Sequence, residues 1–156
     1  MRYLLLGAVL IAAPACAEDD KHLVEVEGVE ILHAWAQASD GPDGRVFVEI
    51  ENEGDVPIVL LGGEAPDVAG SVALMGASIK AGGAPSPVAE MPIEPGNHID
   101  LVPDGLYLAL SDLKTPLTEG EEFEMHLLLE PHGEVEIHVE IEAANATQHS
   151  HAGHNH

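Results

Sequence analysis

The chain has 156 residues, of which 28 are acidic and only 5 are Lys or Arg, giving a formal charge of −23. This length fits one domain preceded by a short leader. So negative a surface repels nucleic acids and anionic membranes, which excludes a nucleic-acid binder, and it attracts cations and basic partners. Solubility is the alternative reason for such a charge.

The first 17 residues have the pattern of a secretory signal peptide. Arg2 precedes an apolar run over residues 3–13, and Ala15-Cys-Ala17 is a small-x-small cleavage site. The run is too short to span a bilayer as a helix, and we expect no membrane insertion after cleavage. The sequence therefore predicts a periplasmic protein that begins at Glu18, with a lipoprotein anchored at Cys16 as the alternative.

Cys16 is the only cysteine of the chain. Cleavage after Ala17 removes it, so the mature protein is expected to have neither a disulfide nor a thiolate ligand. Any metal site must then use His, Met, carboxylates or backbone groups.

Residues 18–142 are expected to form one all-β domain. Short segments alternate apolar and polar residues, and clusters such as Gly41-Pro-Asp-Gly44 separate them. Only residues 65–69 are suited to a single helical turn. Strands at this spacing predict a β-sandwich or barrel. The predicted strands are 22–27, 31–36, 45–52, 56–61, 72–77, 99–102, 106–110, 123–129 and 135–141.

The last two predicted strands form a hairpin whose outer face carries Glu and His. A three-residue loop over 131–133 would place His126 opposite His138, and Glu124 opposite Glu140. Directly opposed residues have Cβ atoms about 4.5–5.5 Å apart, so the two imidazoles could share a metal ion. An exposed polar pair is the alternative, because a different loop length moves the register.

Residues 143–156 lose the apolar period and are predicted to be a flexible tail. Four histidines lie within its last eight residues, interleaved with small and polar residues. Neutral imidazole is a common ligand of transition metals, and short His-rich segments are typical of metal binding. The tail is therefore a candidate metal site, with a solvated polar tail as the alternative. Its histidines are His149, His151, His154 and His156.

Other histidines, including His22, His33, His98 and His132, are expected to be solvated residues of turns or strand edges.

Several motifs follow one another in a fixed order between residues 28 and 141. They are Ile31-Leu-His-Ala-Trp35, Val46-Phe-Val-Glu-Ile-Glu-Asn52-Glu-Gly54, Leu61-Gly-Gly63, Pro66-Asp-Val-Ala69 and the stretch from Pro103-Asp-Gly105 to Leu113-Lys-Thr-Pro116-Leu-Thr-Glu-Gly120. Their types and order resemble the PCuAC family of periplasmic copper chaperones. The resemblance implies a cupredoxin-like Greek-key β-sandwich or barrel.

The chain departs from this family at the copper ligands. The family binds Cu(I) with two His and two Met, a soft set that suits this ion. Met75 and Met91 are the donors that the resemblance leaves, and two thioethers alone predict a lost or weakened core site. The alternative is that both methionines are apolar fillers. The family's ligand positions correspond here to Met75, Tyr107, Ala109 and either Pro85 or Ser86.

Some members of the family carry His- and Met-rich C-terminal extensions, which the tail of this chain resembles. We therefore expect ligation to have moved to the four tail histidines, assisted by Met75 or a histidine on the outer face. Imidazoles without thiolates suit Cu(II), Zn(II) or Ni(II) at least as well as Cu(I).

The resemblance and the tail together predict a periplasmic copper chaperone or copper buffer. By resemblance, the copper would serve a respiratory oxidase of the membrane, such as cytochrome c oxidase, or its assembly factor. The chain has no nucleophile elbow, HExxH motif or Gly-rich phosphate loop, so we do not expect an enzyme. Two alternatives remain: zinc or nickel sequestration by the same tail, and a metal-free interaction module that kept the fold.

Overall fold

The computed structural model describes residues 23–78, 80 and 82–150. The predicted signal peptide, residues 1–17, lies outside this part of the chain. So do three of the four tail histidines, His151, His154 and His156.

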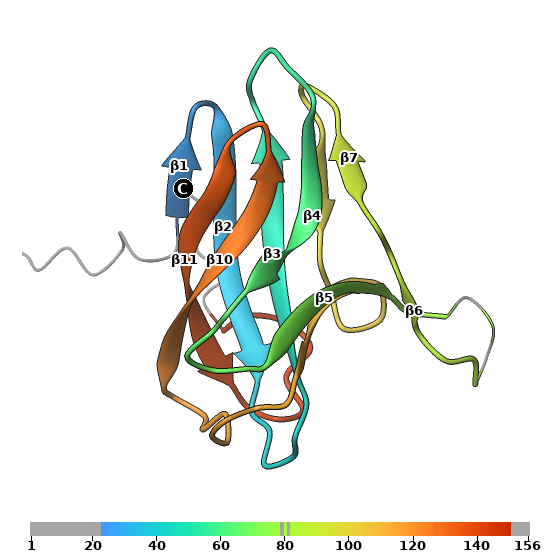
Figure 1. The fold of residues 1–156 in the computed structure, drawn as a ribbon, viewed down its shortest axis with the longest axis vertical. Helices are drawn as coiled ribbons and strands as arrows, with labels where there is room; N and C mark the ends of the chain where they lie inside the picture. Colours follow the sequence, from blue (N-terminus) through green and yellow to red (C-terminus); the bar gives the residue numbers. More distant parts are fainter. Residues whose placement is uncertain (1–22, 79, 81, 151–156) are drawn as a thin grey trace, which may run out of the picture.

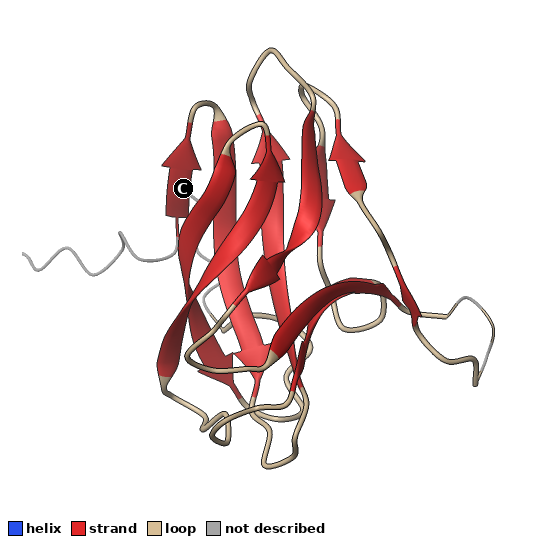
Figure 2. Cartoon of the chain, viewed as in Figure 1, coloured by secondary structure: helices blue, strands red, loops and turns tan. Residues whose placement is uncertain are grey.

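Eleven β-strands make up the regular structure of the described residues (Figure 2). All nine predicted strands are confirmed. The two that were not predicted, β6 and β7, have two and three residues and are too short to show an alternating pattern. The strands are β1 (Leu23–Val26), β2 (Val29–Gln37), β3 (Gly44–Asn52), β4 (Ile58–Glu64), β5 (Ser71–Gly76), β6 (Ser86–Pro87), β7 (Met91–Ile93), β8 (His98–Asp100), β9 (Leu106–Ser111), β10 (Glu122–Glu130) and β11 (Gly133–Glu142).

Residues 65–69 form the single turn that the sequence predicts, with the Ala69 N–H donating to the Ala65 carbonyl at 2.9 Å. Among the described residues, no helix has the length and hydropathy needed to cross a membrane.

The strands form one sheet that curls into a half-barrel (Figure 1). Its strand order is β6-β5-β9-β3-β2-β11-β10-β4-β7, while β1 pairs with β2 and β8 pairs with β3. The pairing of β11 with β2 is parallel, and it places Glu140 beside Trp35 and Glu142 beside Gln37. The C-terminal strand is thereby fixed next to the strand that carries His33. The all-β prediction is confirmed.

The main hydrophobic core fills the inside of the curl. Alternate residues of the long strands point into it, as the period-two pattern predicts, and burial of these apolar side chains is the main stabilising term. Its most deeply buried members include Ile31, Ile50, Ile58, Leu60, Leu108, Met125, Leu127 and Ile137.

A second, smaller cluster lies apart from this core and joins β2, β3 and β9. The rings of Trp35 and Phe47 are 4.5 Å apart between centroids and tilted by 42°, and Tyr107 packs with them. The Arg45 guanidinium lies 4.9 Å from the centre of the Tyr107 ring, a cation–π contact. Ala146, from the segment that follows β11, packs against this aromatic cluster. The middle of β3 is therefore buried on both faces.

The Asn-x-Gly motif at the end of β3 is explained by a buried turn. The Asn52 side-chain amide donates to the carbonyls of Val56 and Ile93, both at 2.9 Å, and its oxygen accepts the Gly54 N–H at 3.1 Å. A buried amide with these three bonds is satisfied, and it ties the β3–β4 turn to β7.

The β10–β11 hairpin has the predicted faces but not the predicted register. Leu129 pairs with Gly133, so Glu124 lies opposite His138 and His126 lies opposite Glu136. The prediction that His126 faces His138 is therefore wrong by a slip of two residues. Gly133 takes a φ of 85°, a conformation that suits glycine, and joins the strand where the sequence suggested a loop residue. A two-residue slip keeps every side chain on its face, so the apolar pattern cannot detect it.

The described part of the predicted tail, residues 143–150, lies against the sheet. The Gln37 side-chain amide donates to the Ala146 carbonyl at 2.9 Å, and the side chain of His149 is only 1% exposed. The sequence of this segment has no periodic apolar pattern that would predict the packing. Ala146 and side-chain hydrogen bonds hold the segment against the sheet.

Candidate metal centre

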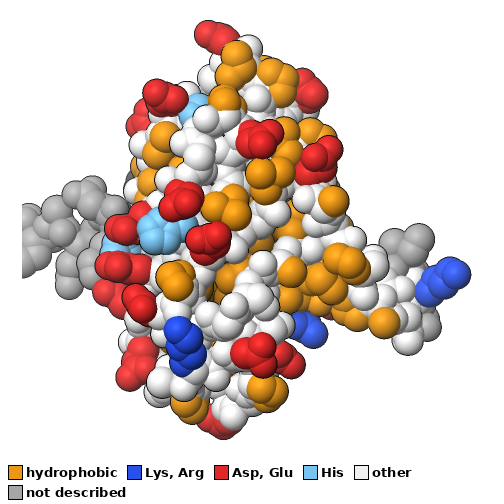
Figure 3. Space-filling view, in the orientation of Figure 1, with side chains coloured by type: hydrophobic (Ala, Val, Ile, Leu, Met, Phe, Trp, Pro, Cys, Tyr) orange, Lys and Arg blue, Asp and Glu red, His pale blue; other side chains and the backbone are white. Residues whose placement is uncertain are grey.

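Every second residue of β11 points outward, and these residues form a row of carboxylates with one imidazole. Glu136, His138, Glu140 and Glu142 all point outward, since successive side chains of a strand alternate between faces. Figure 3 shows histidine among acidic side chains on the face of the molecule that carries β10 and β11. The row contributes to two groups whose ligand atoms lie within 4.8 Å of one another: Glu124, Glu136 and His138, and Glu140, Glu142 and His149.

The second group is the more buried one, and His149 lies between its two carboxylates. Nδ1 of His149 is 2.8 Å from Oε1 of Glu142, and Nε2 is 3.7 Å from Oε2 of Glu140. The backbone N–H and the hydroxyl of Ser150 also donate to Oε1 of Glu142, at 2.8 and 2.7 Å. Glu142 therefore fixes both the His149 ring and Ser150.

Glu142 is ionised at neutral pH. Burial opposes its charge, but the hydrogen bonds from Ser150 and His149 outweigh burial and hold the pKa of the Glu142 carboxyl below its usual value of 4.5. An ionised carboxylate only accepts hydrogen bonds, so Nδ1 of His149 carries the proton. In the neutral imidazole, Nε2 is then the nitrogen that can act as a metal ligand.

His33 forms another wall of this site. It lies at an irregularity of β2, between Leu32 and Trp35, with a φ of 52°. Its ring centre is 5.8 Å from that of His149, and the rings are tilted by 45°. Both imidazoles line a cavity of about 160 Å³, together with Trp35, Glu49 and Asp100 among others. His33 is thus not the solvated residue that the sequence suggested.

Glu49 gives this cavity a pH-dependent charge. Burial, the Asp100 carboxylate and a hydrogen bond with Glu51 raise the pKa of Glu49 above 4.5, and His98 opposes them. A raised pKa means that the folded protein binds more protons than the unfolded chain, so this group removes stability as the pH rises above 4.5.

Glu49→Gln is therefore expected to raise the free energy of unfolding at about pH 7 and to change it little at about pH 4. Urea denaturation of both proteins across this range measures the difference. A variant that is less stable than the wild type at the higher pH would contradict the assignment.

The first group, Glu124, Glu136 and His138, lies on the β10–β11 hairpin and is called the hairpin group. It is more exposed than the group around His149. Glu124 pairs directly with His138, and Nε2 of His126 is 3.7 Å from Oε2 of Glu136. Such exposed pairs between His and Glu contribute little to stability.

His132 is a further histidine that the sequence suggested to be solvated. Its side chain is only 5% exposed, and Nδ1 lies 3.0 Å from Oε2 of Glu27. No sequence signal pointed to this contact between the hairpin loop and the β1–β2 turn.

Three of the positions that the resemblance aligns with the family's copper ligands, Met75, Tyr107 and Ala109, lie close together in the fold. Met75 on β5 pairs with Tyr107 on β9 and with Pro87 on β6. Met75 and Ala109 pack against the Trp35–Phe47–Tyr107 cluster, which occupies this region with apolar groups. At two of these positions the chain offers a phenol ring and a methyl group, and neither is a typical copper ligand.

Met91 lies elsewhere. It pairs with Leu60 between β7 and β4 and packs against the main core, whereas Met75 belongs to the aromatic cluster. The structure does not bring the two predicted thioether ligands together.

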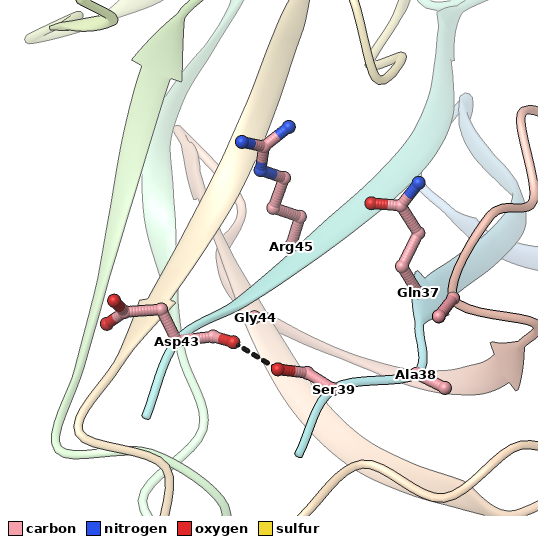
Figure 4. A pocket seen from close by; sticks show the side chains of 7 residues that line it. Gln37, Ala38, Ser39, Asp43, Gly44 and Arg45 are labelled. Atoms are coloured by element: carbon pink, nitrogen blue, oxygen red, sulfur yellow. Dashed lines mark hydrogen bonds between the residues drawn. The ribbon is translucent and has the colours of Figure 1, made fainter. Parts of the chain in front are cut away.

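A larger cavity of about 250 Å³ lies near the start of β3 (Figure 4). The Ser39 hydroxyl donates to the Asp43 carbonyl at 2.6 Å, and so the hydroxyl bonds to a backbone group and not to a base that could activate it. The Arg45 guanidinium makes its cation–π contact with the Tyr107 ring. The lining residues are Gln37, Ala38, Ser39, Asp43, Gly44, Arg45 and Ala144, and this set contains neither a His nor a Cys.

Residues 29–141 match the LpqE-like family, which carries the description "Putative lipoprotein LpqE-like". No curated protein matches the chain.

Solved structures give a consistent picture. The apo PCuAC domain of PmoF1 is 32% identical, with a TM-score of 0.66, and the alignment covers 78% of this chain and 99% of that domain. The apo PCuAC domain of PmoF2 is 25% identical, with a TM-score of 0.69 and coverage of 81% and 99%. DR1885 from Deinococcus radiodurans, solved with Cu(I), shares the fold at 24% identity and a TM-score of 0.55, with coverage of 86% and 89%.

The family match spans most of the chain, and the PmoF1 domain exceeds 30% identity over more than two thirds of it. The chain is therefore a member of the LpqE-like family and has the PCuAC fold.

Proposed function

We propose that this chain is an extracytoplasmic copper-binding protein that carries or buffers copper and is not an enzyme. The ligands are the C-terminal histidines His149, His151, His154 and His156. Copper is the proposed ion because a PCuAC domain of PmoF2, 25% identical to this chain, has been solved with copper bound.

One observation carries the assignment to the C-terminus. His149, the first of the four histidines, is held against the sheet by Glu142 with Nδ1 as the donor. This contact directs Nε2 away from Glu142 and toward Glu140. Since a chain extends at most about 3.5 Å per residue, the histidines two, five and seven positions later can all reach an ion held at His149.

The location and the recipient complete the proposal. The signal-peptide pattern supports export, and the description of the family as lipoproteins supports an anchor at Cys16. Delivery to a membrane oxidase or its assembly factor rests on the resemblance to copper chaperones. An acidic surface suits a basic docking patch on such a partner.

Met75 and Met91 are not part of the proposed site. Met75 packs with the aromatic cluster and Met91 with the main core, so we do not propose them as ligands of one ion.

Zinc or nickel sequestration is a second candidate function. The observation that favours it is the presence of Glu140 and Glu142 within 4.8 Å of the His149 ligand atom, since carboxylates suit borderline divalent ions better than Cu(I). Competition between Cu(II), Zn(II) and Ni(II) for the untagged protein separates the two candidates.

Replacing all four C-terminal histidines by alanine is expected to lower Cu(II) affinity by more than about 100-fold, because the imidazole donors are removed. Circular dichroism should show an unchanged β fold, because these side chains add little to the main core. The measurement is calorimetric titration of the untagged protein. A double variant, His98→Ala with His126→Ala, removes imidazoles elsewhere and should bind as the wild type does. Unchanged affinity in the fourfold variant would show that the C-terminus is not the site.

A further inference from the structure

We propose that the sheet itself supplies a divalent-metal site, in which His33, Glu140 and His149 hold one Cu(II) or Zn(II) ion and Glu142 positions His149. The inference rests on the proposed function, because His149 belongs to both. It goes further in that the site needs none of the last three histidines and uses residues of β2 and β11.

Glu142 prepares His149 for this role. A carboxylate that accepts the Nδ1–H of a ligating histidine fixes the tautomer and the ring orientation, a common arrangement behind metal-bound imidazoles. The 2.8 Å contact between His149 and Glu142 has this form, and the two bonds from Ser150 hold the same carboxylate oxygen in place. Nε2 of His149 is thereby presented to Glu140.

Glu140 is within reach of the same ion. Two ligands that each lie about 2.0–2.2 Å from a metal are about 2.8–4 Å apart, depending on the angle between them. The separation of 3.7 Å between Nε2 of His149 and Oε2 of Glu140 falls inside this range. No backbone movement is needed for both atoms to bind one ion.

His33 is the proposed third ligand. The group with ligand atoms within 4.8 Å of one another holds Glu140, Glu142 and His149. Because His33 is outside this group, a rotation of its ring is needed to bring a nitrogen to the ion. Two imidazoles bound to one ion through metal–nitrogen bonds of about 2.0 Å have ring centres about 4.5–6 Å apart. The rings of His33 and His149 are 5.8 Å apart and line one cavity. The parallel pairing of β2 with β11 sets Glu140 beside Trp35, which lies two residues after His33. The three ligands therefore come from adjacent strands and from the segment docked on them.

The ligand set selects the ion. Two imidazoles and one carboxylate suit Cu(II) and Zn(II), whereas Cu(I) prefers thioethers and thiolates. Glu49 and Asp100 line the same cavity and add negative charge that attracts a cation. The site would thus hold the oxidised form of copper, in contrast to the Cu(I) chemistry of a site with two His and two Met.

Trp35 makes the site observable. It is the only tryptophan of the chain and lines the same cavity as His33 and His149. Cu(II) bound there should quench its fluorescence, while Zn(II) should bind without strong quenching because its d shell is filled.

The test uses the full chain with His151→Ala, His154→Ala and His156→Ala, titrated with Cu(II) and with Zn(II). We expect one ion per chain and loss of Trp35 fluorescence with Cu(II). In this background, His149→Ala, Glu140→Gln and His33→Ala should each lower the affinity at least about 10-fold. His126→Ala with Glu124→Gln alters the hairpin group on the same sheet and is the matched control, which should bind unchanged.

The role of Glu142 has its own readout. Glu142→Gln keeps an acceptor for the Nδ1–H of His149, so it should recover most of the affinity that Glu142→Ala loses. Equal losses in the two variants would contradict a positioning role through this hydrogen bond.

The outcomes separate the two proposals. If the wild type binds Cu(II) and the threefold alanine variant does not, the inference is overturned and the C-terminal histidines remain the site. If the threefold variant binds but none of the three ligand substitutions weakens it, the ion lies elsewhere and the inference is again overturned. If the wild type itself binds no metal, the proposed function fails. Thermal unfolding of each variant confirms that a loss of binding is not a loss of fold.

Discussion

Phe47→Ala is expected to lower the free energy of unfolding by about 3–5 kcal/mol, the range for removal of a fully buried aromatic side chain. Phe47 is inaccessible to solvent and packs on Trp35 and Tyr107. Its loss opens a cavity in the cluster against which Ala146 packs. Urea denaturation measures the change.

The Phe47 prediction includes a matched control. Phe47→Leu keeps most of the volume and should cost less than half as much. A loss below about 1 kcal/mol for Phe47→Ala would show that the aromatic cluster is not an integral part of the fold.

Restoring the family's donors is expected to create a Cu(I) site where the aromatic cluster now lies. The change is Met75→His, Tyr107→His and Ala109→Met with Pro85→Met, in a chain whose C-terminal histidines are replaced by alanine. Met75 and Tyr107 are already paired, and Ala109 lies two residues along the same strand. Pro85 lies two residues before Pro87, the partner of Met75, so the four side chains should share one face and converge. Thioethers with imidazoles favour Cu(I) over Zn(II).

A Cu(I) competition titration measures the effect of the restored donors. We expect tight binding in the fourfold variant, and none in a control with Tyr107→Phe, which keeps the ring and adds no donor. The variant also loses the contact between Arg45 and the Tyr107 ring, so a modest loss of stability should accompany the gain. Failure of the restored donors to bind Cu(I) would put the correspondence of these positions in doubt. Tight Cu(I) binding by the unmodified core would show that the ligands were wrongly assigned.

The strands could be predicted because each long one has a buried face and an exposed face. Met125, Leu127 and Leu129 point inward as expected, and so do Val135 and Ile137. The register could not be predicted, since a slip of two residues leaves this pattern unchanged and the turn alone decides between the alternatives. The hairpin accordingly pairs Glu124 with His138, and the expected pair of histidines does not form.

The sequence predicted only part of the candidate site. The density of histidines near the C-terminus pointed to His149, but nothing local to His149 pointed to Glu140 or His33. These residues meet because β11 pairs in parallel with β2, a contact between segments about 100 residues apart along the chain. The docking of residues 143–150 also escaped prediction, because hydrogen bonds to Glu142 and Gln37 leave no periodic signal.

The most direct measurement of where the metal binds is anomalous diffraction at the copper edge, on crystals of the untagged protein loaded with Cu(II). We predict one dominant peak next to Nε2 of His149, on the side of Glu140. A dominant peak between Met75 and Tyr107, or no ordered copper at His149, would contradict the assignment of copper binding to the C-terminal segment.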